Sequence, residues 1–67
     1  MNLLGQELSK IVWQNLNNAQ DGGYDQTNEP IDLICNDLIN YAGNLDDYEV
    51  EELRPHVIAW KTSRINS

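Results

Sequence analysis

Hydrophobic residues recur at the spacing of an α-helix in three separate stretches of this chain. In the clearest stretch, residues 30–44, the apolar side chains fall on one side of a helix at about 100° per residue. Pro30 suits the first turn of a helix, and Gly43 and Asn44 are two residues that tolerate the left-handed conformation that closes a helix. We therefore predict a central helix over this range. Its apolar stripe contains Ile31, Ile34, Cys35, Leu38, Tyr41, Ala42 and Leu45, with Ile39 at the edge.

A first helix is predicted over residues 3–20, where apolar residues again recur at helical spacing. Trp13 falls outside this stripe. An indole in that position either covers the edge of the core against another helix or anchors a partner protein. The stripe of the first helix contains Leu4, Leu8, Ile11, Val12, Leu16 and Ala19.

The third predicted helix covers residues 47–64 and has a detailed start signal. Asp46 is placed as the N-cap and Glu49 as its capping-box partner. Pro55 ought to end or bend a helix, yet the apolar residues from Val50 to Trp60 keep one angular phase across it. We predict one helix kinked at Pro55, with two abutting helices as the alternative.

Together these helices predict an all-α protein, a small three-helix bundle with residues 1–67 in a single helical domain. No sustained alternation of apolar and polar residues predicts a strand. Turn-forming residues cluster at 21–27, which we predict to be a loop. The side-chain oxygens of this loop do not match the spacing of a calcium-binding EF-hand, so no metal site is predicted.

Charge is the most unusual property of the sequence. The formal net charge is −7, and residues 21–52 contain all but one of the 11 acidic residues and no Lys or Arg. Direct nucleic-acid binding is disfavoured, because affinity for phosphates comes from Lys and Arg. A protein with a basic surface is the expected electrostatic partner.

No combination of residues predicts catalysis. The sequence has no Ser/His/acid or Cys/His set that the fold would assemble and no Gly-rich phosphate loop, so we predict no enzymatic activity and no cofactor. One cysteine and one histidine cannot supply the four ligands of a zinc site. Cys35 lies in an apolar stripe, which is typical of a buried thiol in a reducing compartment. With neither a signal peptide nor a membrane-spanning run, we expect a soluble, cytoplasmic protein that does not contact membranes.

The first of two functional hypotheses uses the negative charge. Carboxylates on rigid helices would imitate nucleic-acid phosphates, and small acidic helical proteins of phages and mobile elements share this general character. We predict a protein-binding module that acts as such an inhibitor and blocks a basic nucleic-acid-handling protein. The alternative is a surface that only keeps a small protein in solution. The predicted partner-binding carboxylates are Asp32, Asp37, Asp46, Asp47, Glu49, Glu51 and Glu52.

The second hypothesis is a structural or regulatory interaction protein that forms a homodimer or docks a partner helix. Several apolar side chains fall outside the clean stripes, where they would form a binding patch. Added salt weakens contacts between charges but leaves apolar association intact, so salt dependence separates the two hypotheses. The apolar candidates are Trp13, Leu33, Ile58, Tyr24 and Ile65.

Overall fold

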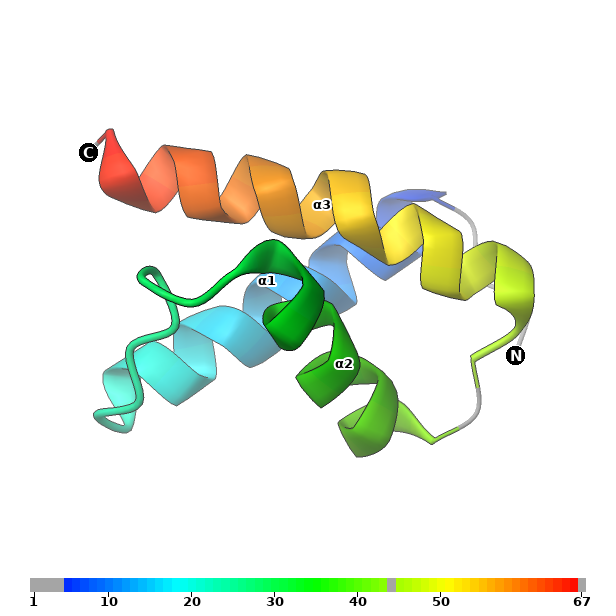
Figure 1. Cartoon of the computed structure of the whole chain (residues 1–67), viewed down its shortest axis with the longest axis horizontal. Coiled ribbons are helices and arrows are strands. Elements are labelled where there is room, and N and C mark those ends of the chain that lie inside the picture. The colour runs from blue at the N-terminus through cyan, green and yellow to red at the C-terminus, as the bar shows by residue number, and fades with distance from the viewer. Residues whose placement is uncertain (1–4, 44, 67) are drawn as a thin grey trace.

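The computed structural model describes residues 5–43 and 45–66. They form three α-helices: α1 (Gly5–Asp21), α2 (Ile31–Ala42) and α3 (Asp47–Ile65) (Figure 1). Within these ranges there is no strand, which confirms the predicted all-α class. No described helix combines the length and apolar character needed to cross a membrane.

The helix limits differ from the predicted ones by one or two residues. Asp21, predicted to begin the loop, is the last residue of α1, and Pro30 precedes α2 rather than forming its first turn. Gly43 follows α2 with a φ of 75°, a left-handed conformation that glycine adopts without steric cost, and its N–H donates to the Ile39 carbonyl at 2.9 Å. Residues 3, 4 and 44 of the predicted helices lie outside the described residues.

The start of α3 has the predicted capping box. The backbone N–H of Asp46 donates to Glu49 Oε1 at 3.1 Å, and the Asp46 side chain accepts from the backbone N–H of Glu49. The chain then stays helical through Pro55, so two abutting helices do not form. The kink at Pro55 remains a prediction.

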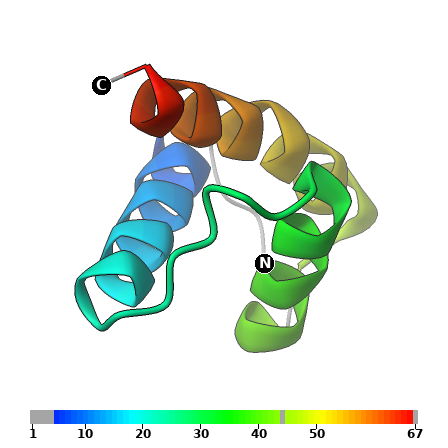
Figure 2. The same ribbon diagram turned by 60° about the vertical axis from the view of Figure 1, so that its left-hand side comes forward.

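The third helix packs against both of the others and holds them together. Both α1 and α2 pack against α3, whereas they make few direct contacts with each other. In Figure 2, α1 and α2 lie on the same side of α3 and diverge from each other with distance from it. The connecting segment 22–30 crosses the space between them. The core lies where the three helices meet. Its buried residues are Leu8, Val12, Leu16, Ile34, Cys35, Leu38, Leu53, Val57 and Trp60.

A cluster around Trp60 holds α1 against α3. The Trp60 side chain is fully buried, and its indole N–H donates to Asn17 Oδ1 at 2.8 Å. The guanidinium of Arg64 lies 5.9 Å from the centre of the Trp60 ring and also donates to Asn17. A buried indole with a hydrogen-bond partner combines a large apolar contact with a satisfied polar group, so this cluster fixes the position of α1.

Two basic residues of α3 hold the other side of the fold. Arg54 forms an ion pair with Asp32 of α2. The Lys61 ammonium donates to the Glu29 carbonyl at 2.6 Å, just before α2 begins. Both cations of this face of α3 are therefore engaged within the chain.

Cys35 is buried in the core, as its place in the apolar stripe predicted. Burial raises the pKa of its thiol, because the thiolate loses its hydration. A thiol that stays protonated is a poor nucleophile, so Cys35 behaves as a small apolar side chain.

Candidate protein-binding groove

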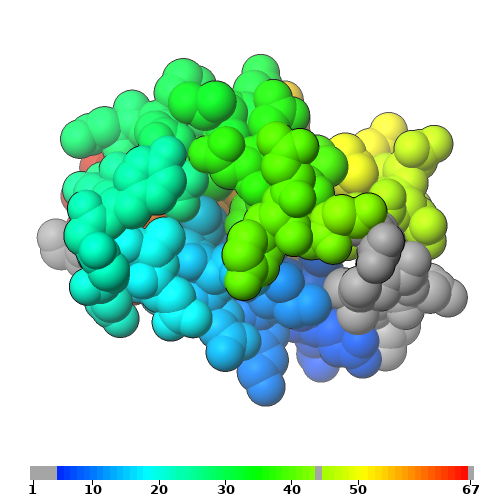
Figure 3. Space-filling model, turned by 90° about the horizontal axis from the view of Figure 1, so that it is seen from below, coloured from blue at the N-terminus to red at the C-terminus, as the bar shows by residue number. Residues whose placement is uncertain are grey.

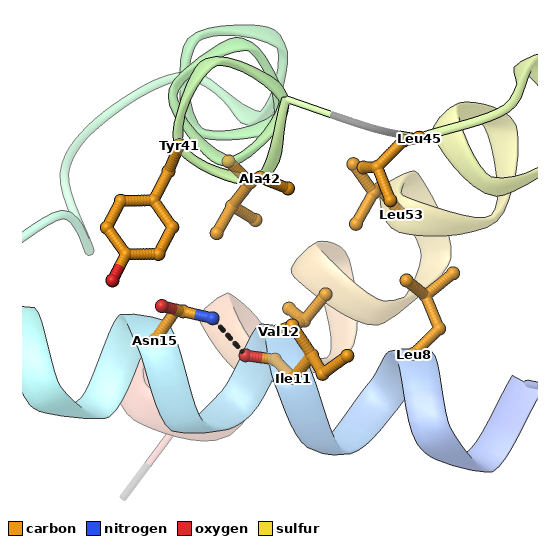
Figure 4. Close-up of a pocket in the computed structure, with 9 residues that line it drawn as sticks. Leu8, Ile11, Val12, Asn15, Tyr41, Ala42, Leu45 and Leu53 are labelled. Carbon is orange, nitrogen blue, oxygen red and sulfur yellow. Dashed lines mark hydrogen bonds between the residues drawn. The ribbon is translucent and has the colours of Figure 1, made fainter. Parts of the chain in front are cut away.

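An apolar cavity of about 200 Å³ lies between α1 and α2. Figure 4 shows its walls: Tyr41 and Ala42 project from α2 toward Ile11 and Asn15 of α1. Figure 3 shows the same face of the molecule, with a hollow between the side chains of α1 and those of α2. The lining residues are Leu8, Ile11, Val12, Asn15, Leu38, Tyr41, Ala42, Leu45 and Leu53.

The divergence of α1 from α2 creates this cavity. Four of the lining residues, Leu8, Val12, Leu38 and Leu53, are buried core residues, whereas Ile11 and Tyr41 stay exposed beside them. Ile11 is 37% exposed and Tyr41 is 79% exposed. Both residues belong to the predicted apolar stripes, yet the fold buries neither of them.

A second cavity, of about 450 Å³, continues from the first and is more polar. The two cavities share Asn15, Leu38 and Tyr41 in their linings. Asn15 is fixed by a hydrogen bond from its side-chain amide to the Ile11 carbonyl at 2.8 Å. The second cavity adds Leu16, Asn18, Ala19, Tyr24, Gln26 and Asp37. We call the two cavities together the α1/α2 groove.

Gln26 and Asp37 meet in the polar part of the groove. Gln26 is only 5% exposed, and its side-chain amide donates to Asp37 Oδ2 at 3.3 Å. Nearby, the Tyr24 hydroxyl donates to Glu29 Oε1 at 2.8 Å. This hydrogen bond and partial desolvation raise the pKa of Tyr24, and the charges of Glu29 and Asp37 add to the effect. Two carboxylates thus lie close to one phenol.

The predicted partner-binding carboxylates are spread over α2 and α3. Asp46, Asp47 and Glu51 are exposed at the start of α3, whereas Glu52 is only partly exposed. Asp32 is exposed but paired with Arg54, and only Asp37 lines the α1/α2 groove.

Glu49 was predicted to be an accessible partner-binding carboxylate, and this prediction is wrong. It is 1% exposed, because the capping box directs its side chain back along α3. A carboxylate in this position supports the helix end and does not present its charge to a partner. Glu49 therefore does not belong to the accessible acidic surface.

The predicted apolar candidates come from all three helices and from the segment between α1 and α2. Trp13 packs against the core on the flank of α1 that also carries Asn17, which contacts α3. Ile58 is 44% exposed on the flank of α3 that carries Arg54 and Lys61. Leu33 is exposed on the side of α2 opposite its core stripe. A single binding patch formed by these side chains remains a prediction.

Sequence reasoning did not identify the groove. Tyr41 and Ile11 look like core residues in the sequence. Periodicity shows which side of a helix is apolar, but it does not show which other helices pack against that side. No sequence pattern predicts that Gln26 is buried in the groove, because it lies in a segment without hydrophobic periodicity. Among the described residues, no group of three His, Cys, Asp or Glu side chains is placed to hold a metal ion.

Comparison of the chain with protein-family models, curated proteins and solved structures found no match.

Proposed function

We propose that this protein is a binding module for another protein, and that the α1/α2 groove docks the apolar face of a partner's amphipathic helix. The observation that carries the proposal is the open apolar cavity between Ile11 and Tyr41, two large side chains that the rest of the described chain leaves exposed. Hydrophobic grooves between helices commonly receive helices whose anchor residues recur at i, i+3 or i+4, and i+7.

The size of the cavity supports a protein side chain as the occupant. Pockets for drug-sized ligands and cofactors have volumes of about 300–1,000 Å³. The polar cavity of the groove, at about 450 Å³, falls within this range, whereas the apolar cavity is smaller, at about 200 Å³. It suits one bulky apolar anchor, and such buried anchors provide most of the binding energy at protein interfaces.

Charge complementarity supports a basic partner rather than a second copy of the chain. The net charge is −7, and no Lys or Arg is among the described residues that line the groove. Arg54 and Lys61 are engaged within the chain. Two copies would repel each other, whereas a helix with Lys or Arg beside its apolar face would be attracted.

Ile11→Glu is expected to weaken helix binding at least about tenfold, because it places a charge in the apolar cavity. The probe is a display library of amphipathic helical peptides with fixed apolar anchors and random flanking positions, selected on the immobilised protein. Enriched peptides are then titrated against wild type and variant by fluorescence anisotropy.

The matched control for this experiment is Ile58→Glu. Ile58 has similar exposure, 44% against 37% for Ile11, but lies on α3 outside the groove. This variant is expected to bind the enriched peptides like the wild type. Failure to enrich any peptide, or equal loss of binding in both variants, would contradict docking in the groove.

A second candidate function is the block of a basic nucleic-acid-handling protein by charge mimicry, as an inhibitor from a phage or mobile element. It is supported by the exposed carboxylates of Asp46, Asp47 and Glu51 on a continuous helix and its N-cap. This function does not need the groove.

The absence of enzymatic activity and the cytoplasmic location remain predictions.

Charge reversal tests this second function. Glu51→Lys combined with Glu52→Lys is expected to abolish capture of nucleic-acid-binding proteins from a lysate of the source cells, and wild-type capture should fall with added salt or competing DNA. Ile11→Glu serves as the control that leaves such capture intact. Capture that survives the charge reversal would count against mimicry.

The finer features of the fold are also part of the proposal: the three helices form a bundle, and α3 is kinked at Pro55. A proline in a helix clashes with the carbonyl four residues earlier and removes one hydrogen bond, which bends the helix axis. An experimental structure in solution would test both features through the interhelical contacts and the angle between the two halves of α3.

A further inference from the structure

We propose that Asp37 selects a Lys or Arg side chain on the docked helix, next to the apolar anchor that fills the first cavity. This inference rests on the proposed docking function and extends it, because it names the residue that distinguishes one amphipathic helix from another. Asp37 would thus determine specificity, while Ile11 and Tyr41 would supply apolar contact.

The geometry of the groove places the two contacts side by side. The apolar cavity and the polar cavity share Asn15, Leu38 and Tyr41, so they form a continuous surface. A helix that inserts an anchor beside Tyr41 presents residues of its neighbouring turns to the polar cavity, where Asp37 lies. The side chains of Lys and Arg are long enough to cover this offset while their aliphatic stems contact Tyr41.

The hydrogen bonding of Asp37 leaves it able to accept a further donor. An ionised carboxylate has about four acceptor positions. The described part of the chain gives Asp37 a single hydrogen bond, from Gln26, at the long distance of 3.3 Å. Asp37 is also partly buried, and a charge-assisted hydrogen bond in such a position is stronger than one on an open surface.

The other acidic residue of α2 provides the comparison. Asp32 is more exposed than Asp37 and is paired with Arg54, so its charge is already balanced. No cation performs this role for Asp37 among the described residues that line the groove. The two carboxylates belong to the same helix and have the same charge, but only Asp37 lies in the groove without a cationic partner.

A double-mutant cycle tests the inference. One enriched helical peptide is prepared with Lys and with Gln at its preferred basic position, and both peptides are titrated against the wild type, Asp37→Asn and Asp32→Asn. We expect the wild type to bind the Lys peptide at least about tenfold more tightly than the Gln peptide. Asp37→Asn should remove this preference, whereas Asp32→Asn should retain it. Circular dichroism checks that both variants are folded.

The outcomes separate the inference from the proposed function. If no peptide is enriched on the wild type, the docking function and the role of Asp37 are both wrong. If peptides bind in the groove without a basic preference, or if both Asn variants reduce the preference equally, the docking function stands and the role of Asp37 is wrong. Equal reduction would indicate a general effect of net charge.

Discussion

Trp60→Ala is expected to lower the free energy of unfolding by about 3–5 kcal/mol, the usual cost of truncating a large core aromatic side chain to alanine. Trp60 is fully buried, and its indole joins α1 to α3 through Asn17. A single core in a chain shorter than about 70–80 residues rarely supplies more than about 3–5 kcal/mol in total. Most molecules of this variant should therefore be unfolded at 25 °C.

Urea titration monitored by circular dichroism measures this effect. The helical signal is used because, unlike tryptophan fluorescence, it does not depend on the tryptophan that the mutation removes. Trp60→Phe is the control: it retains a buried ring but loses the hydrogen bond to Asn17, and should remain folded with a smaller loss of stability. A Trp60→Ala protein within about 1 kcal/mol of the wild type would show that this residue does not organise the core.

Pro55→Ala is expected to act in the opposite direction and to raise the free energy of unfolding by as much as about 3 kcal/mol. Pro55 lies inside α3, where it lacks the N–H that would donate to the Glu51 carbonyl. Its side chain is exposed, so its replacement removes no core contact. The variant should therefore gain a hydrogen bond and lose a steric clash.

The same urea titration measures the gain. Thr62→Ala is the control for helix propensity alone, because Thr62 is also exposed in α3 and its replacement should gain less than about 0.7 kcal/mol. If Pro55→Ala is no more stable than Thr62→Ala, then α3 accommodates the proline without strain. The kink predicted at Pro55 would lose its support in the same experiment.

The sequence predicts the helices well because their signals are local. Apolar periodicity defined all three, and the relation between Asp46 and Glu49 predicted the capping box at the start of α3. The pair Gly43 and Asn44 likewise predicted the end of α2, and Gly43 is the residue that closes it. Each of these features depends on residues within one or two helical turns.

Properties that depend on how helices meet were not predicted. The capping-box pattern of Glu49 does not reveal that its side chain is buried, because burial depends on what packs over the helix end. Tyr41 fits the apolar stripe of α2, yet it is 79% exposed and lines the open groove beside α1. The groove arises from the angle between α1 and α2, which no single helix encodes.

The arrangement around α3 has a consequence for the synthesis of the protein. The first two helices contact α3 far more than they contact each other, and α3 comes last of the three in the chain. Isolated helices of this length are only marginally stable in water. While the ribosome is still making α3, the nascent α1 and α2 therefore lack the partner that stabilises them. We expect the chain to fold in one late step, when Trp60 has emerged and reaches Asn17.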